Sequence, residues 1–134
     1  MFDTVNLPLE AGRWVPFVYD IDIVGIDLTS AAFAMQVHDT KDRTAGTPRA
    51  SLTTQTTDVE GIRLVGVVTT DGVPTSSIRV RINETTMEAM DVANDAALPG
   101  NDGDAYWDMH ITPSGGDKFL AFNGTFTVKA GVTQ

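Results

Sequence analysis

The chain contains no cysteine. The lack of thiols excludes a disulfide framework, a cysteine nucleophile and a metal site built from thiolates, and it fits synthesis in a reducing cytoplasm. No apolar run approaches the ~18 residues that a membrane-spanning helix needs, so we expect no membrane partner. The N-terminal residues 1–5 lack a basic region followed by an apolar one, and we therefore expect no signal peptide.

Positive charge is scarce as well. Nine lysine and arginine residues stand against 18 acidic residues, which gives a formal net charge of −9 at pH 7. Such an acidic chain repels phosphate backbones, which argues against nucleic-acid binding. The sequence also lacks a nucleophile-elbow motif and a phosphate-binding glycine loop before a helix. We therefore predict that the protein is not an enzyme and uses no cofactor.

What the sequence does contain is a series of short runs with strand patterning. Residues 1–134 are expected to form one domain, with residues 1–12 as an ordered arm or an edge strand. Turn residues separate the runs, which lie at residues 13–23, 33–38, 49–56, 62–69, 76–83, 106–112 and 119–128. This pattern predicts an all-β fold, an antiparallel β-sandwich of seven or eight strands.

The last thirty residues carry the clearest pattern. Trp107, Met109 and Ile111 alternate with polar residues, and after a Pro-Ser-Gly-Gly-Asp loop Phe122 and Phe126 share a face. This alternation predicts a β-hairpin with its aromatic side chains in the core.

Two further elements are expected. The core face of the run at residues 13–23 should hold Val15, Phe17, Tyr19, Ile21 and Ile23. Pro16 cannot donate a hydrogen bond to a neighbouring strand, so this run is expected at a sheet edge or at a bulge. Thr85 and Glu88 have the spacing of a capping box, which predicts one short helix that buries Met87.

Several segments together carry a resemblance to a known family. They are Asp27-Leu28-Thr29, the run from Phe33 to Val37, the pair Phe119-Leu120, the run from Gly124 to Val128, and the closing Val132-Thr133. This pattern resembles small virion proteins of tailed bacteriophages, whose β-sandwich domains are similar to the N-terminal domain of upper baseplate or tail-fibre-anchoring proteins.

The resemblance implies a structural virion protein that assembles with copies of itself and with tail, baseplate or fibre neighbours. It implies a homo-oligomer, since many such proteins form rings or trimers. Longer family members continue past the closing Val-Thr into a fibre or receptor-binding region, whereas this sequence stops at Gln134. We therefore expect an adaptor or anchor in the tail.

Two alternative functions stay open. A capsid decoration or head-fibre protein would use residues 1–12 as its arm. A carbohydrate-binding module would need exposed aromatic residues along a groove, and Trp14 and a calcium loop at residues 101–104 would be its features.

The candidate site residues follow from these readings. Asp102 and Asp104 are a weak calcium candidate on a glycine-containing loop, with a plain turn as the favoured interpretation. His38 and His110, each expected on the side of its strand away from the core, could bind a metal with Asp108 or Asp39, but two histidines without a closely spaced third ligand favour no metal site.

The candidate interface residues are Trp14, Arg79 and Arg81. Trp14 is either an exposed interface residue or part of a small cluster under the N-terminal arm. The two arginines share an outward strand face, where a solvated surface is favoured over an acidic partner. Asp20 and Asp22 also share a face, but acid/base chemistry would require a cleft.

Overall fold

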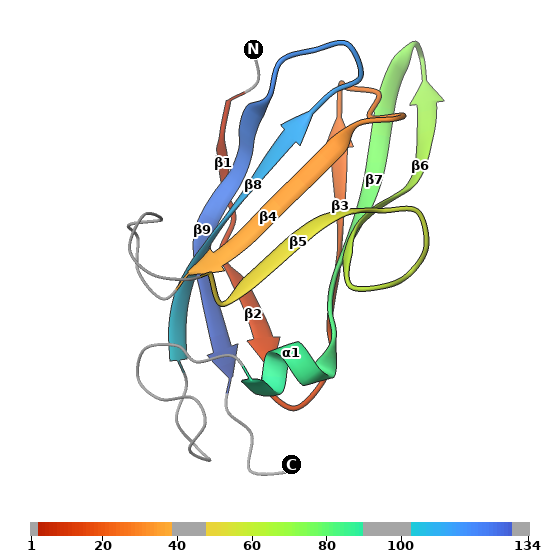
Figure 1. Cartoon of the computed structure of the whole chain (residues 1–134). Coiled ribbons are helices and arrows are strands. Elements are labelled where there is room, and N and C mark those ends of the chain that lie inside the picture. The colour runs from red at the N-terminus through yellow and green to blue at the C-terminus, as the bar shows by residue number, and fades with distance from the viewer. Residues whose placement is uncertain (1–2, 39–47, 90–102, 130–134) are drawn as a thin grey trace.

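The computed structural model describes residues 3–38, 48–89 and 103–129, with the backbone alone at Gly103 and Asp104. Nine strands and one helix make up these residues (Figure 1). Their bounds are β1 Val5–Asn6, β2 Leu9–Gly12, β3 Phe17–Val24, β4 Ala32–His38, β5 Ala50–Gln55, β6 Gly61–Thr70, β7 Val73–Ile82, α1 Glu84–Ala89, β8 Gly103–Thr112 and β9 Phe119–Lys129. No described helix has the length and apolar character needed to cross a membrane.

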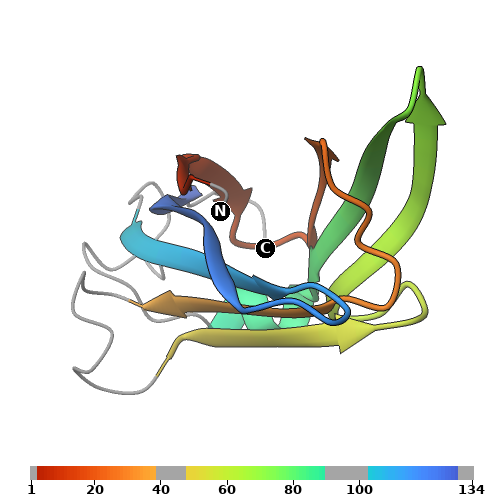
Figure 2. The same ribbon diagram turned by 90° about the horizontal axis from the view of Figure 1, so that it is seen from above.

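The strands form one continuous sheet in the order β1-β9-β8-β4-β5-β6-β7-β3, and β2 also pairs with β9. The strand β5 joins the two halves, because its first residues pair with β4 and its last two pair with β6. Figure 2 shows that the sheet curls, so that β3 and β1 both rise above the layer formed by β9, β8, β4 and β5.

The prediction of an all-β fold with one short helix is confirmed. The sheet is mixed, however, and the expectation of purely antiparallel pairing is wrong. The N-terminal strands β1 and β2 run parallel to β9, and β5 runs parallel to β6. Local alternation sets the face of a strand but not its neighbour, which is why the sequence could not reveal these pairings.

A single apolar core fills the concave side of the curled sheet. Ile78, Val80 and Ile82 of β7 are fully buried, as their alternation predicts. The ring of Phe17 on β3 meets the ring of Phe126 on β9 edge to face, with 5.3 Å between centroids. This contact links the two ends of the sheet across the core.

The strand β3 lies at a sheet edge, as Pro16 predicts, but it begins only at Phe17. Phe17 and Ile21 are buried, whereas Val15 and Tyr19 are 53% and 38% exposed. The expected core face is therefore wrong at these two positions. Val15 precedes the strand, and Tyr19, whose ring stacks on that of Phe17 with 6.1 Å between centroids, stays partly exposed at the sheet edge.

The helix α1, Glu84–Ala89, begins two residues earlier than the capping box predicts. The backbone N–H of Met87 donates to the carbonyl of Asn83 at 3.0 Å, which makes Asn83 the residue that caps the helix. Thr85 therefore lies inside the helix, and its role as the cap was predicted wrongly. Met87 is fully buried, as predicted.

The N-terminal arm is fixed to the sheet by a close backbone approach. A Cβ atom added at Gly124 would lie only 2.5 Å from the carbonyl oxygen of Leu7. Trp107 donates from its indole Nε1–H to the same oxygen at 2.8 Å, and Leu7 donates its N–H to the carbonyl of Asn123 at 2.8 Å. The glycine thus leaves the space in which the arm docks.

The buried serine Ser76 holds the segment between β3 and β4. Its hydroxyl donates to the carbonyl of Ile26 at 2.7 Å and accepts from the N–H of Leu28 at 2.9 Å. Both backbone groups belong to a connection that packs against the core, so one side chain satisfies two groups that would otherwise be unpaired.

Candidate functional site

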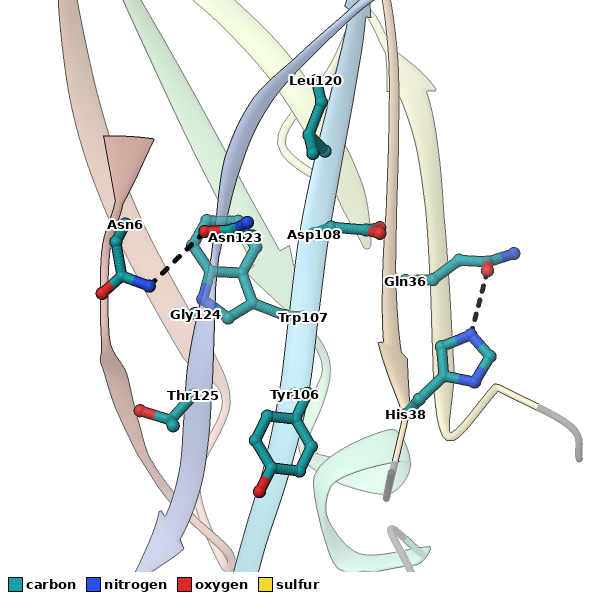
Figure 3. Close-up of a pocket in the computed structure, with 10 residues that line it drawn as sticks. All are labelled: Asn6, Gln36, His38, Tyr106, Trp107, Asp108, Leu120, Asn123, Gly124 and Thr125. Carbon is teal, nitrogen blue, oxygen red and sulfur yellow. Dashed lines mark hydrogen bonds between the residues drawn. The ribbon is translucent and has the colours of Figure 1, made fainter. Parts of the chain in front are cut away.

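A groove lined mostly by residues with polar side chains, the polar groove, lies on the outer face of β1, β9, β8 and β4 (Figure 3). Its volume is about 440 Å³, within the usual size range of small-ligand sites. The residues that line it are Asn6, Gln36, His38, Tyr106, Trp107, Asp108, Leu120, Asn123, Gly124 and Thr125. Most of these side chains come from the polar positions of alternating strands, which is why four strands bring them to one face.

His38 is only 3% exposed, so the expectation of an exposed histidine is wrong at this position. Tyr106 is its direct partner on β8, and the Nε2 atom of His38 lies 3.1 Å from Oε1 of Gln36. Paired residues on one face of a sheet place their side chains side by side, so these neighbours cover the ring. The Nδ1 atom of His38 is buried and has no hydrogen-bond partner among the residues that the structure describes.

The candidate metal ligands do not come together in the described part of the chain. No group of three or more histidine, aspartate or glutamate residues there is placed to hold a metal ion. Asp104 lies within β8, in register with Thr127, so its expected place in a loop is wrong. Asp39 and Asp102 lie outside the described residues.

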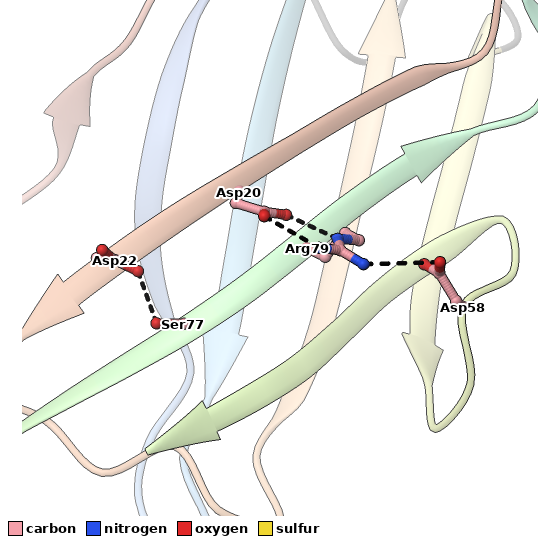
Figure 4. Close-up of polar contacts among 5 residues, drawn as sticks. All are labelled: Asp20, Asp22, Asp58, Ser77 and Arg79. Carbon is pink, nitrogen blue, oxygen red and sulfur yellow. Dashed lines mark hydrogen bonds and ion pairs between the residues drawn. The ribbon is translucent and has the colours of Figure 1, made fainter. Parts of the chain in front are cut away.

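Arg79 lies at the centre of an ion-pair network on the outer face of β7 and β3 (Figure 4). Its Nε donates to Oδ1 of Asp20 at 2.8 Å and its Nη2 donates to Oδ2 at 3.1 Å, while Nη1 lies 3.6 Å from Oδ2 of Asp58. The hydrogen bond from Arg79 lowers the pKa of Asp20, and the same bond raises the pKa of Arg79. Acidic groups of the same chain therefore already pair with this candidate interface arginine.

Arg81 and Trp14, the other candidate interface residues, also contact side chains of the same protein. Arg81 donates from Nε to the side-chain oxygen of Asn83 at 3.0 Å. Trp14 is half-buried, with the guanidinium carbon of Arg13 5.7 Å from its ring centroid. Arg13 in turn donates to the carbonyl of Glu88 in α1 at 2.8 Å. Trp14 thus lies beside an arginine that is tied to the helix.

Asp20 and Asp22 share the outer face of β3, as expected. The two carboxylates do not line the same groove, since among the described residues Asp22 lines a groove and Asp20 does not. Asp20 pairs with Arg79, and Asp22 accepts a hydrogen bond from the hydroxyl of Ser77 at 2.6 Å. Each carboxylate is thus already bound by a side chain of β7, whereas acid/base catalysis requires a carboxyl group within hydrogen-bond reach of a substrate.

A second, apolar groove opens between the two ends of the curled sheet. Its volume is about 330 Å³, and β1 forms one rim while β3 forms the other. The lining residues are Asp3, Val5, Asp22, Ile23, Val24, Ile26, Ile111, Phe119, Ala121 and Phe122. Sequence reasoning missed this groove, because its walls come from opposite ends of the chain, and the only hint was that Pro16 places β3 at an edge.

The outer face of β3, β7 and β6 carries exposed valines. Val24 and Val68 are each 67% exposed, and both pair with Thr75 of β7, which lies between them. Val18 and Val73 are also exposed on this face. The valine face, defined by Val24, Val68 and Val73, lies at the turn end of the β6–β7 hairpin, which projects from the molecule in Figure 2, whereas Val18 is in register with Arg81 beyond the Asp20–Arg79 ion pair.

Three comparisons were made with known proteins. No protein-family model, no curated protein sequence and no solved structure matches the chain.

Proposed function

We propose that the chain is a structural, non-enzymatic protein of a tailed-phage virion, a tail, baseplate or tail-fibre adaptor. It acts by assembling with copies of itself and with neighbouring virion proteins. The sequence resemblance suggests this class, and the observation that carries the proposal is the valine face. Exposed aliphatic side chains on neighbouring strands favour burial against another protein surface.

The assembly part of the proposal is tested by a charge on the valine face. Val68→Glu places a carboxylate on the valine face, across Thr75 from Val24, whereas Val59→Glu makes the same change in the β5–β6 turn, at a residue that is 47% exposed and outside the face. We expect only Val68→Glu to lower the oligomeric mass measured by light scattering. Equal masses for both variants would remove the valine face from the proposal.

The virion part of the proposal is tested by labelling intact phage particles with an antibody against the chain and viewing them by electron microscopy. Label at the tail or its tip supports the adaptor. Label over the head would favour the alternative of a decoration or head-fibre protein. Complete particles without any label would refute a virion protein of either kind.

The polar groove of Figure 3 favours a second candidate function, the binding of a carbohydrate. Amide and carboxylate groups such as those of Gln36, Asn123 and Asp108 match vicinal hydroxyls, and Tyr106 supplies an aromatic ring. Trp107 lines the groove, so its fluorescence in a Trp14→Phe background reports binding. A saturable change during oligosaccharide titration supports this function, and a flat response up to millimolar sugar contradicts it.

A further inference from the structure

The apolar groove between β1 and β3 has one wall that is an open sheet edge. The strand β3 pairs with β7, and no other described strand pairs with it. On the opposite side of the groove lies β1, whose one neighbour among the described strands is β9. Figure 2 shows that β1 and β3 rise on opposite sides of the curled sheet, and the apolar groove lies between these two edges.

The register of β3 shows which of its backbone groups face the opening. The N–H of Gly25, the residue after β3, donates to the carbonyl of Pro74 at 2.7 Å, and the pairing of β3 with β7 runs without a bulge. In an antiparallel pair, alternate residues bond to the neighbour and the residues between them point away. The backbone groups of Val18, Asp20, Asp22 and Val24 therefore point away from β7, toward the open edge.

Over residues 20–23, the side chains of β3 are apolar on the concave side of the sheet and acidic on the outer face. Ile21 and Ile23 point into the concave side and contact the core, whereas Asp20 and Asp22 lie on the outer face. A strand added to this edge would place every second side chain in the apolar groove and the alternate side chains beside the two carboxylates. Asp3 adds a third acid at the β1 rim.

We propose that this opening, the strand slot, accepts an extended segment of a partner protein in which apolar and basic residues alternate. The added strand pairs with β3, its apolar side chains enter the groove, and its lysines or arginines lie beside Asp20 and Asp22. This inference deepens the proposed assembly function and rests on it, since it names the kind of neighbour that the adaptor would hold.

The acidic side chains of β3 favour a basic partner segment in the strand slot over a second copy of the chain. Pairing of two β3 strands would bring the Asp22 carboxylates of both copies to one edge, together with Asp20 carboxylates that Arg79 already pairs with, in a protein whose net charge is −9. Like charges on facing strands are unfavourable, and charged edge residues discourage self-association. The same carboxylates attract a basic strand, which makes the slot selective.

The test uses a labelled seven-residue peptide of alternating valine and lysine, with capped ends, titrated into the full chain by fluorescence anisotropy. One control peptide replaces lysine by glutamate, and another has the same composition with its lysines and valines in two blocks. We expect the alternating peptide to bind about tenfold more tightly than either control, because only it matches both faces of the edge. Equal binding of all three peptides would overturn the proposal.

Two variants locate the binding. Asp22→Lys reverses a charge at the slot, and Glu88→Lys makes the same change at an exposed residue of α1, at the far end of the molecule from β1 in Figure 1. We expect Asp22→Lys to weaken the peptide about tenfold and Glu88→Lys less than about twofold. Circular dichroism confirms that both variants fold, and equal weakening by both would show nonspecific attraction to an acidic protein.

Hydrogen exchange separates strand pairing from surface attachment. Bound peptide should slow the exchange of the backbone amides of Asp20, Asp22 and Val24, and protection elsewhere would refute pairing with β3. If the chain alone forms a dimer that Asp22→Lys abolishes, the occupant is a second copy. If the peptide binds but the antibody does not label virions, the strand slot stands and only the virion function is refuted. If the antibody labels virions but the peptide does not bind, only the strand slot is refuted.

Discussion

Substitution of Gly124 by alanine tests how the N-terminal arm is held. The new Cβ would lie 2.5 Å from the oxygen and 2.9 Å from the carbon of the Leu7 carbonyl. Ordinary contact requires about 3.5 Å or more, so Leu7 must move by about 1 Å. That movement disturbs the hydrogen bond from Trp107, since its indole N–H reaches the same oxygen at 2.8 Å.

The expected cost follows from two contributions. Overpacking of a close contact costs about 1–3 kcal/mol, and a buried indole N–H that loses its acceptor costs about 1–3 kcal/mol. The contributions overlap, because the same shift of Leu7 relieves the first and causes the second. We therefore expect Gly124→Ala to lower the free energy of unfolding by about 3 kcal/mol.

The chain offers a matched control in Gly66. A Cβ atom there would meet nothing within 4 Å, and Gly66 lies in β6, so Gly66→Ala adds the same methyl group in open space. We expect this control to be neutral or to stabilise the protein by up to about 1 kcal/mol, since glycine weakens a strand.

Urea unfolding followed by circular dichroism measures both variants, and hydrogen exchange at Leu9 and Ala11 reports whether the arm has loosened. A Gly124→Ala protein within about 0.5 kcal/mol of the unmodified chain would refute the close approach of Leu7. Equal destabilisation by Gly66→Ala would show that the loss has nothing to do with the arm.

Three further predictions concern the core and one ion pair. Ser76→Ala should lower the free energy of unfolding by about 2–4 kcal/mol in urea titrations, because two backbone groups lose their partner, and an effect below about 0.5 kcal/mol would contradict that role. Met87→Ala should lower the free energy of unfolding by about 2–5 kcal/mol in the same titrations, because it leaves a cavity in the core. An unchanged free energy of unfolding would show that the helix does not contribute to the core. Asp20→Asn should lower the urea midpoint at neutral pH. The hydrogen bond from Arg79 keeps the folded pKa of Asp20 below the unfolded value, so the stabilisation is present above that unfolded value and is lost as pH falls through the folded one. The two midpoints should converge once the pH falls below the folded pKa of Asp20, and a gap that persists there would show that the charge is not its cause.

Much of the fold was predictable because it depends on neighbouring residues. The alternation of Trp107, Met109 and Ile111 placed these side chains in the core, and all three are buried. Pro16 marked β3 as an edge strand through its missing N–H, and the structure confirms the edge. Each of these properties follows from chain chemistry within a few residues.

The candidate site was less predictable. The histidine pattern indicated an exposed His38, but the ring is covered by neighbours on its own face. The arginine pattern indicated that Arg79 faces outward but could not show that Asp20, 59 positions away, already pairs with it. For the apolar groove the sequence gave only the indication from Pro16 that β3 lies at an edge, because β1 and β3 come to lie on opposite sides of one groove only when the sheet curls.

The sequence by itself determined an all-β domain, the buried face of most strands and the short helix, because a period of two and local turn chemistry are encoded residue by residue. The tertiary structure alone decided that the arm runs parallel to β9, that Gly124 makes room for Leu7, and that two sheet edges leave an apolar opening between them. These features depend on contacts between segments about a hundred positions apart, such as Trp107 with Leu7, and no local pattern specifies which distant segments meet.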